Sequence, residues 1–435
     1  MTIRSTLGSL ALVAGLFAGA SMASAQDSGP LIDLLVRKGI VSYQEAESLR
    51  AELVRDFAAN TPAGKLNLTS HVTDFKLSGD LRIRGQYETQ APEVNPTGVT
   101  NERFRNRFRF RFNGDFGMPK GWSAGFALET AAAADSGNQT LQDGGDDYAT
   151  SLARAYVGYR PNANWNFVAG KQRNLIYTTD LVWDGDINPQ GFYQSYTKFL
   201  SGKDTFEIRA GQWMMDDRNE STAGPSGRDA WLFTQQAVYT KWFAPDNLSS
   251  FTIAPGFMKY NASVLDGQTG EASFVGTTRY LTNFVMPGAV NFAHFGRTGA
   301  SGQVYWDYSY NFEANQRVRR AYGMPAGTKK DGTAWLLGVG YAFGNGRVQG
   351  DYSLKLDYRQ IGLGSIDPNI NDSDFAFSHL NQKGFKLATS YNLTDFANFN
   401  LTYMHTTHLR AGVNQATIAA RDHTQLLQAD LVVRF

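Results

Sequence analysis

The chain of 435 residues contains no cysteine. This absence excludes disulfide bonds, thiol catalysis, thiolate metal sites and cysteine-ligated iron–sulfur clusters. Beyond an apolar run near its start, the chain also lacks any stretch of about eighteen apolar residues, which excludes a membrane-spanning helix. The 41 basic and 40 acidic residues nearly cancel, so the overall charge does not support general nucleic-acid binding.

Glycine and aromatic residues are abundant instead, with 44 Gly, 29 Phe and 20 Tyr, although the mean hydropathy is −0.35. A β-barrel in a membrane turns only alternate residues toward lipid and keeps a polar interior, so its mean hydropathy resembles that of a soluble protein. Composition therefore allows both a soluble β-sheet protein and a membrane barrel, and the local pattern has to separate them.

The segment 103–112 alternates arginine with phenylalanine, which predicts an extended strand with two chemically opposite faces. One face carries Arg103, Arg105, Arg107, Arg109 and Arg111, and the other carries Phe104, Phe108, Phe110 and Phe112. The arginines need water or anions, whereas the phenylalanines need an apolar neighbour. In a membrane barrel the arginines must face the lumen, because arginine on the lipid face costs roughly 2–4 kcal/mol near the bilayer midplane.

Both ends of the chain favour the membrane barrel. Arg4, the apolar run 7–20 and the small residues 23–25 predict a cleaved secretory signal peptide over residues 1–25. Cleavage removes one of 41 basic residues and no acidic one, leaving 40 of each in the exported chain. The last strand ends on Phe435, which resembles the closing strand of bacterial outer-membrane barrels.

Residues 26–64 differ from the rest because they show helical periodicity. Leu31, Leu34 and Leu35 fit a first helix, and Ser42 with Glu45 forms a capping box for a second one. We expect a short periplasmic helical hairpin followed by a linker. Such a pair is too small for a core of its own, so it should pack across subunits or cap the barrel.

From residue 65 to the end, the sequence predicts an all-β transmembrane antiparallel barrel. Apolar and polar residues alternate with a period of two, and short turns such as 161–164 alternate with long polar loops such as 174–189. Short turns on one rim and long loops on the other are typical of outer-membrane barrels. The pattern predicts about 16 strands. A barrel of 14 or 18 strands is also compatible with the sequence, because the number of strands within residues 261–298 is ambiguous.

Arg82 and Arg84 lie on the preceding strand and should point the same way as the arginines of 103–111. In a narrow pore, such a basic wall would raise the local concentration of anions. The alternative is that the arginines pair with acids in the lumen and only stabilise the structure.

The signal peptide, the segment Gly-Ile-Val-Ser-x-x-Glu-Ala-Glu at 39–47, the barrel pattern and terminal Phe435 together resemble the putative porin family of proteobacterial outer membranes. This resemblance implies a homotrimer, surrounded by outer-membrane lipid, through which small hydrophilic solutes diffuse passively. In trimeric porins the third long loop folds into the barrel and places acids opposite a basic ladder. Asp180, Asp184 and Asp186 match that arrangement in order and charge, although the usual Pro-Glu-Phe-Gly-Gly motif is absent.

Two other functions stay open at this point, namely a substrate-specific channel for phosphate, a carboxylate or an acidic saccharide, and a barrel enzyme or adhesin. The sequence contains no Gly-x-Ser-x-Gly, His-Glu-x-x-His or phosphate-binding loop motif. The Asp-x-Asp-x-Asn run at 184–188 lacks the glycine and glutamate of a calcium loop. We therefore expect no catalytic residue, no cofactor, no metal site and no nucleic-acid partner.

Overall fold

The computed structural model divides the chain into two compact units, residues 1–70 and 71–435. In the first unit the structure describes residues 32, 35–36, 38, 41–42, 44–49, 52 and 68–70. In the second it describes 71–92, 101–131, 136–142, 144–145, 147–217, 229–243, 248–261, 278, 280–296, 299–321, 329–410 and 421–435. The signal peptide expected at 1–25 lies outside the described residues.

The first unit has a helical segment over residues 44–49. The Ser42 N–H donates to the Glu45 carboxylate at 2.9 Å, and the Glu45 N–H donates to the Ser42 hydroxyl at 3.3 Å. These reciprocal bonds confirm the expected capping box. Most of the expected hairpin at 26–64 lies outside the described residues, so the hairpin stays a prediction.

Among the described residues, no helix has the length and apolar character needed to cross a membrane.

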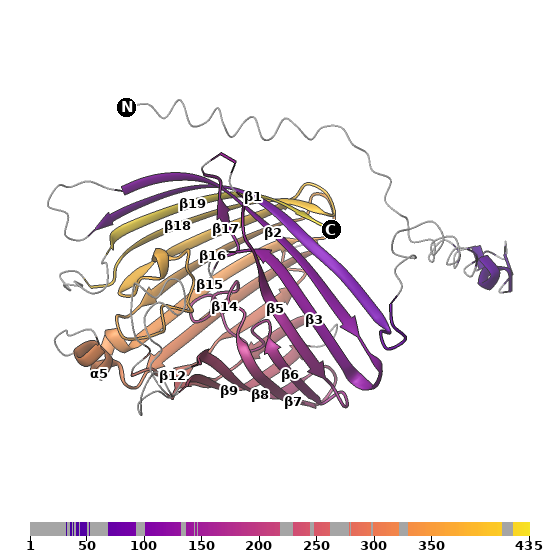
Figure 1. Cartoon of the computed structure of the whole chain (residues 1–435), viewed down its shortest axis with the longest axis horizontal. Helices are drawn as coiled ribbons and strands as arrows, with labels where there is room; N and C mark the ends of the chain where they lie inside the picture. The colour runs from indigo at the N-terminus through magenta and orange to yellow at the C-terminus, as the bar shows by residue number, and fades with distance from the viewer. Residues whose placement is uncertain are drawn as a thin grey trace. The chain divides into compact units, whose positions relative to one another are not determined.

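The second unit is a single antiparallel sheet with short helical pieces in its loops (Figure 1). Its strands are β1 (Asp74–Pro92), β2 (Asn101–Gly117), β3 (Trp122–Thr130), β4 (Gln139–Thr140), β5 (Thr150–Tyr159), β6 (Trp165–Lys171), β7 (Gln190–Phe199), β8 (Thr205–Asp216), β9 (Ala230–Phe243), β10 (Ser249–Ile253), β11 (Gly256–Tyr260), β12 (Thr282–Val285), β13 (Gly288–Ala293), β14 (Ala300–Asn311), β15 (Thr333–Phe343), β16 (Tyr352–Ile361), β17 (Gln382–Asn392), β18 (Ala397–His408) and β19 (Arg421–Arg434). The helical pieces are η2 (Pro119–Gly121), α5 (Ala314–Gln316), η5 (Arg317–Ala321), η6 (Lys329–Gly332) and η7 (Ala376–Ser378).

The sheet closes on itself as a barrel of sixteen strands. Strands β10 and β11 both pair with β9, and β12 and β13 both pair with β14, so each pair is one strand interrupted at Pro255 or Pro287. Proline has no N–H to donate, which explains the interruptions. β4 is a two-residue piece beside β2. The expected strand number is therefore confirmed, and β12 with β13 supplies the strand that the sequence left ambiguous.

Closure is made by β1, which pairs with β2 on one side and with β19 on the other. The last residue takes part, because the Gly79 N–H donates to the Phe435 carbonyl at 2.8 Å and the Phe435 N–H donates back at 3.1 Å. A Cβ at Gly79 would lie 2.5 Å from the Phe435 ring, so only glycine leaves room for that ring. The terminal strand thus closes the barrel, as its pattern predicts.

The barrel wall exposes apolar side chains and buries charged ones. On β1 and β2, Leu81 and Phe110 are 41% and 37% exposed, whereas Arg84 and Arg109 are only 5% and 6% exposed. In a soluble protein the charged side chains are exposed and the apolar ones are buried. A barrel surrounded by lipid needs apolar side chains on its outer face. On β2, Phe110 therefore lies on the exposed face of the wall and Arg109 on the buried face.

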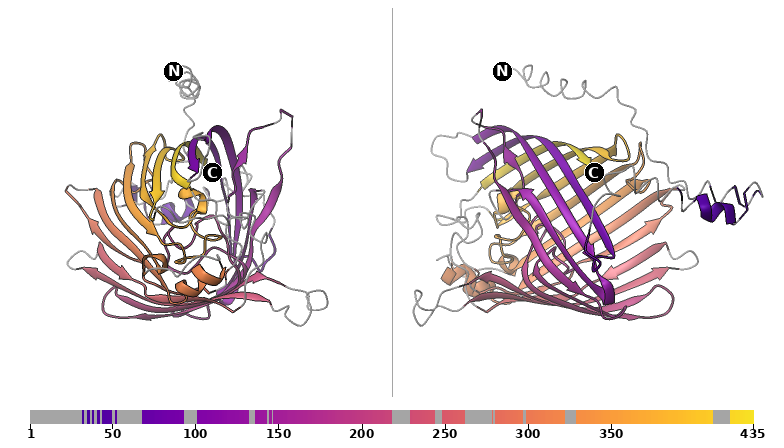
Figure 2. Two further views of the ribbon diagram at one scale, coloured as in Figure 1. Left: turned by 90° about the vertical axis from the view of Figure 1, so that its left-hand side faces the viewer. Right: turned by 45° about the vertical axis from the view of Figure 1, so that its right-hand side comes forward.

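Eight long connections alternate with short turns along the chain, and two of them matter for function. We call residues 172–189, between β6 and β7, the third loop, and residues 362–381, between β16 and β17, the seventh loop. Their apolar side chains form a shared core with the inner wall. Those of the third loop include Leu181, Val182 and Trp183, and those of the seventh include Ile366, Ile370 and Phe375. The view in Figure 2 (left) shows orange and yellow coils lying within the ring of strands. Describing all long loops as polar was therefore wrong for these two.

Candidate functional site

The pairing of β1 with β2 places arginines directly opposite each other. Arg82 faces Arg109 and Arg84 faces Arg107 in the register of the two strands. Like charges at directly opposed positions destabilise a sheet. We call the arginines at 82, 84, 105, 107, 109 and 111 the arginine wall. These side chains can lie next to one another only if acidic groups from elsewhere lie between the guanidinium groups.

Carboxylates on neighbouring strand positions supply the first part of this compensation. Asp80 on β1 pairs with Arg109 at 3.0 Å and with Arg111 at 2.8 Å. Asp430 on β19 accepts two hydrogen bonds from Arg84, at 2.7 and 2.9 Å. Two further pairs are Arg82 with Asp430 at 3.9 Å and Arg105 with Glu88 at 2.7 Å.

The two inner loops supply the rest. Asp186 of the third loop lies 3.6 Å from Arg109 and 3.9 Å from Arg111. Asp374 of the seventh loop lies 3.5 Å from Arg84. Each loop thus brings one carboxylate to the arginine wall.

Arg107 differs from its neighbours, because in the described part of the chain no carboxylate lies within ion-pair distance of it. Its guanidinium donates to the Gln86 amide at 3.3 Å, the Asn138 carbonyl at 3.2 Å and the Ser136 hydroxyl at 3.4 Å. Arg103, also expected in this set, is exposed. Six arginines, at 82, 84, 105, 107, 109 and 111, thus lie among six carboxylates of the described residues, at 80, 88, 129, 186, 374 and 430, where Glu129 is opposite Arg111 in the register of β2 and β3. The cluster is close to neutral.

The third loop contacts strands all around the ring. The Tyr177 N–H donates to Gln236 of β9 at 2.9 Å, and the Thr179 hydroxyl donates to Asp307 of β14 at 2.8 Å. Asp180 pairs with Lys386 of β17 at 3.2 Å, and Asp186 reaches β2. A loop that meets β2, β9, β14 and β17 must cross the interior of the barrel. The sequence left the position of this loop open, and these contacts place it inside the barrel.

The third and seventh loops are joined to each other by backbone hydrogen bonds. The Asp184 N–H donates to the Ile370 carbonyl at 2.6 Å, and the Asp372 N–H donates to the Asp180 carbonyl at 3.0 Å. The Asp184 carboxylate accepts the Ser373 N–H at 3.0 Å. Burial, together with the nearby charge of Asp372, raises the pKa of Asp184 to about 8.

The three loop aspartates expected from the sequence therefore have three different partners. Asp186 meets the arginine wall, Asp180 pairs with Lys386, and Asp184 binds the backbone of the seventh loop. Only Asp186 lies where an acid opposite the predicted arginine row was expected.

Sequence reasoning missed a second charged cluster, which lies on β16 and β17. Arg359 pairs with Asp357 and with Asp372, both at 2.7 Å, and its guanidinium lies 4.8 Å from the centre of the Phe375 ring. Lys386 adds an ion pair with Asp372 at 3.1 Å. Burial opposes ionisation of Asp372, but the charges of Lys386 and Arg359 outweigh it and lower its pKa.

A signal for this cluster exists in the sequence. Lys355, Asp357 and Arg359 alternate with Leu354, Leu356 and Tyr358 in the same way as the arginines and phenylalanines of β2. Within the described ranges, no three His, Asp or Glu side chains gather in a way that would hold a metal ion.

A family model described as a putative porin matches residues 86–280. No curated protein matches the sequence closely enough to indicate a relative. Among solved structures, the chain is similar to OprB of Pseudomonas putida, with 11% identity, a TM-score of 0.50, and 83% of this chain and 94% of that chain covered. It is also similar to the outer-membrane channel DcaP of Acinetobacter baumannii, with 12% identity, a TM-score of 0.46, and 85% and 99% covered.

The family match confirms the resemblance over residues 86–280, and the structural likeness, at such low identity, concerns the fold alone. The family match and the fold together point to a channel and not to an enzyme.

Proposed function

We propose that this chain forms a channel in the outer membrane of a Gram-negative bacterium, through which small hydrophilic solutes diffuse passively with a preference for anions. The observation that carries this proposal is the third loop, which crosses a closed barrel and narrows its interior beside a row of arginines. The export signal expected at residues 1–25 and the apolar outer face support the proposed location.

The proposed anion preference rests on Arg107, whose guanidinium donates to neutral groups and has no carboxylate within ion-pair distance among the described residues. In a narrow, low-dielectric passage even one positive charge without a direct ion pair biases the local ion concentration. We propose that Arg82, Arg84 and the arginines of β2 line the passage and share this role.

Replacing Arg105, Arg107 and Arg109 together with glutamine should turn the anion preference into a cation preference. The change leaves three arginines of this cluster against six carboxylates, so the net charge of the cluster becomes negative. The reversal potential of the purified protein in a planar bilayer under a KCl gradient measures this change. Salt near 0.1 M is required, because the Debye length is about 10 Å there and only about 3 Å at 1 M.

The matched control replaces Arg160, Lys198 and Arg347, which are exposed, with glutamine. It removes the same charge away from the arginine wall and should leave the reversal potential close to that of the original protein. An unchanged reversal potential in the β2 triple variant would mean that the arginines are only structural.

We further propose that the protein is a homotrimer, with β6 in the interface. A tilted strand needs about 9–11 residues to span a bilayer. β6 has only 7 residues, whereas β1 has 19. The outer surface at β6 nevertheless carries Trp165 and Phe167, which are exposed and apolar. Because β6 is too short to span the bilayer, we propose that another copy of the chain, and not lipid, covers its outer surface.

Light scattering in detergent should therefore give about three times the mass of one chain, and Phe167→Glu should reduce it to one. The control is Leu356→Glu, which places the same charge on the outer row of β16, eight strands around the ring. A single-chain mass for the unchanged protein, or equal dissociation by both variants, would contradict the proposed interface.

A further inference from the structure

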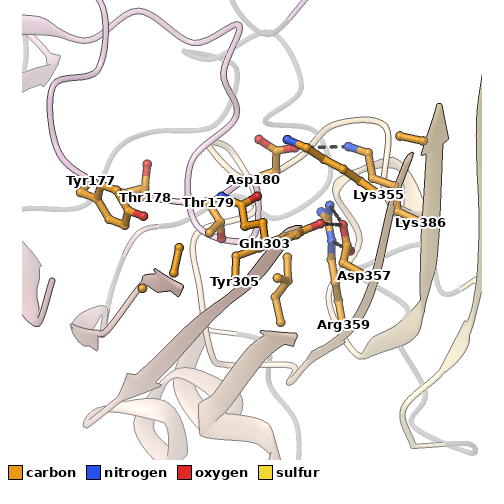
Figure 3. Close-up of a pocket in the computed structure, with 14 residues that line it drawn as sticks. Tyr177, Thr178, Thr179, Asp180, Gln303, Tyr305, Lys355, Asp357, Arg359 and Lys386 are labelled. Carbon is orange, nitrogen blue, oxygen red and sulfur yellow. Dashed lines mark hydrogen bonds and ion pairs between the residues drawn. The ribbon is translucent and has the colours of Figure 1, made fainter. Parts of the chain in front are cut away.

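A cavity of about 290 Å³ lies between residues 177–180 of the third loop and the wall formed by β13 to β17 (Figure 3). Its size is just below the usual range for small-molecule sites, roughly 300–1,000 Å³, so it suits a monomeric solute better than an oligomeric one. Gly288, Ala289 and Ala388 line part of it, and such short side chains leave the space open.

Three cationic side chains line the cavity, but two of them are already engaged. Arg359 is held by Asp357 and Asp372, and Lys386 is held by Asp180 and Asp372.

The third cation, Lys355, is exposed. As far as the described residues extend, it has no carboxylate within ion-pair distance. Lys355 therefore offers a complete positive charge to a ligand in the cavity, and a negatively charged group would be its natural partner.

The cavity also presents hydrogen-bonding groups with unused capacity. The Asp180 side chain is 51% exposed and, among the residues that the structure describes, forms an ion pair with Lys386 alone. Gln303 donates its amide N–H to Asn291 at 2.8 Å, which leaves its carbonyl oxygen as an acceptor. Thr178 and Tyr177 add hydroxyl groups that can donate. A ligand that satisfies this set carries several hydroxyl groups in addition to its charge.

We propose that this cavity is a binding site for small hydroxylated carboxylates on their way through the channel. Lys355 binds the carboxylate, and Asp180 and Gln303 accept hydrogen bonds from the hydroxyl groups. Lys386 lies 3.2 Å from Asp180 and so weakens the repulsion between that acid and the incoming anion. This inference rests on the proposed channel function, and it places the substrate-specific step on β16, away from the arginine wall of β1 and β2.

The test uses the full exported protein in planar bilayers, with chloride as the charge carrier. Gluconate is added as the hydroxylated carboxylate, glucose as a neutral polyol and propionate as a carboxylate without hydroxyl groups. We expect gluconate to reduce the current in a saturable manner and at lower concentrations than the other two compounds. Lys355→Gln should raise the half-blocking concentration of gluconate about tenfold, as expected for the loss of one charge-assisted hydrogen bond.

The matched control is Lys259→Gln, because Lys259 is exposed on β11 in the same row as the outward-facing Phe257. It should leave the gluconate block unchanged. A block that is equally strong in Lys355→Gln overturns the proposed site, and so does an equally strong effect of glucose or propionate. An unmodified protein that carries no current before any solute is added overturns the channel function instead, so the two failures are distinguishable.

Discussion

Replacing Arg359 with leucine is expected to destabilise the folded barrel by about 3–5 kcal/mol, because it leaves the buried Asp357 without its cation and Asp372 with Lys386 alone among the described residues. The guanidinium of Arg359 is almost fully buried and lies 2.7 Å from both Asp357 and Asp372. Denaturant unfolding in detergent micelles, followed by tryptophan fluorescence, measures the change in the free energy of unfolding.

A matched control and a rescue variant separate the buried pair from general effects of the substitution. Arg347→Leu removes the same side chain from an exposed turn and should change the free energy of unfolding by no more than about 0.5 kcal/mol. Adding Asp357→Asn to Arg359→Leu should recover part of the loss, since one uncompensated charge disappears. Equal stabilities of the Arg359 variant and the original protein would show that the two acids have other compensation.

Replacing residues 177–187 with a short Gly–Ser linker should raise the single-channel conductance by about twofold or more. The third loop crosses the interior from β9 and β14 to β2, so its removal widens the passage. Conductance follows the free cross-section of a pore. Single-channel recording measures the increase in conductance. Liposome swelling with solutes of increasing size shows whether larger solutes pass through the variant than through the original protein.

The control inserts the same linker at Gly202, in the exposed turn between β7 and β8. This variant contains the same Gly–Ser linker but keeps the third loop, so its single-channel conductance should equal that of the original protein. The migration of unheated and heated samples on a gel shows whether each barrel is folded. A folded deletion variant with unchanged conductance would be incompatible with a third loop that narrows the pore.

Much of the fold could be predicted because a β-strand is encoded locally. The alternation of Arg103 to Phe112 sets which face is apolar, and the structure shows Phe110 exposed and Arg109 buried. The strand number follows from the same short-range patterns, whereas the inward third loop and the closing role of Phe435 were expected only from the resemblance to porins and other outer-membrane barrels. The break at Pro255 was not predicted, although proline is a local signal for it.

The candidate site was predicted less completely, because its charges depend on partners from distant parts of the chain. Arg84 is compensated by Asp430, which is 346 positions away, and by Asp374 of the seventh loop. The sequence identified a row of arginines but not the acids that make it nearly neutral. It also assigned one role to the three loop aspartates, whereas Asp184 binds the seventh loop rather than the arginine wall.

Neighbouring residues alone specify a barrel with an apolar outer face, because the alternation along each strand is a local property of the chain. Which charges remain available inside the barrel depends on how distant strands and loops come together. Buried ions must be paired, and closing the sheet brings together acids and bases that are far apart in the chain. Among the described residues, Arg107 and Lys355 have no carboxylate within ion-pair distance. We therefore assign the anion preference to the cluster that contains Arg107 and solute binding to the cavity that contains Lys355.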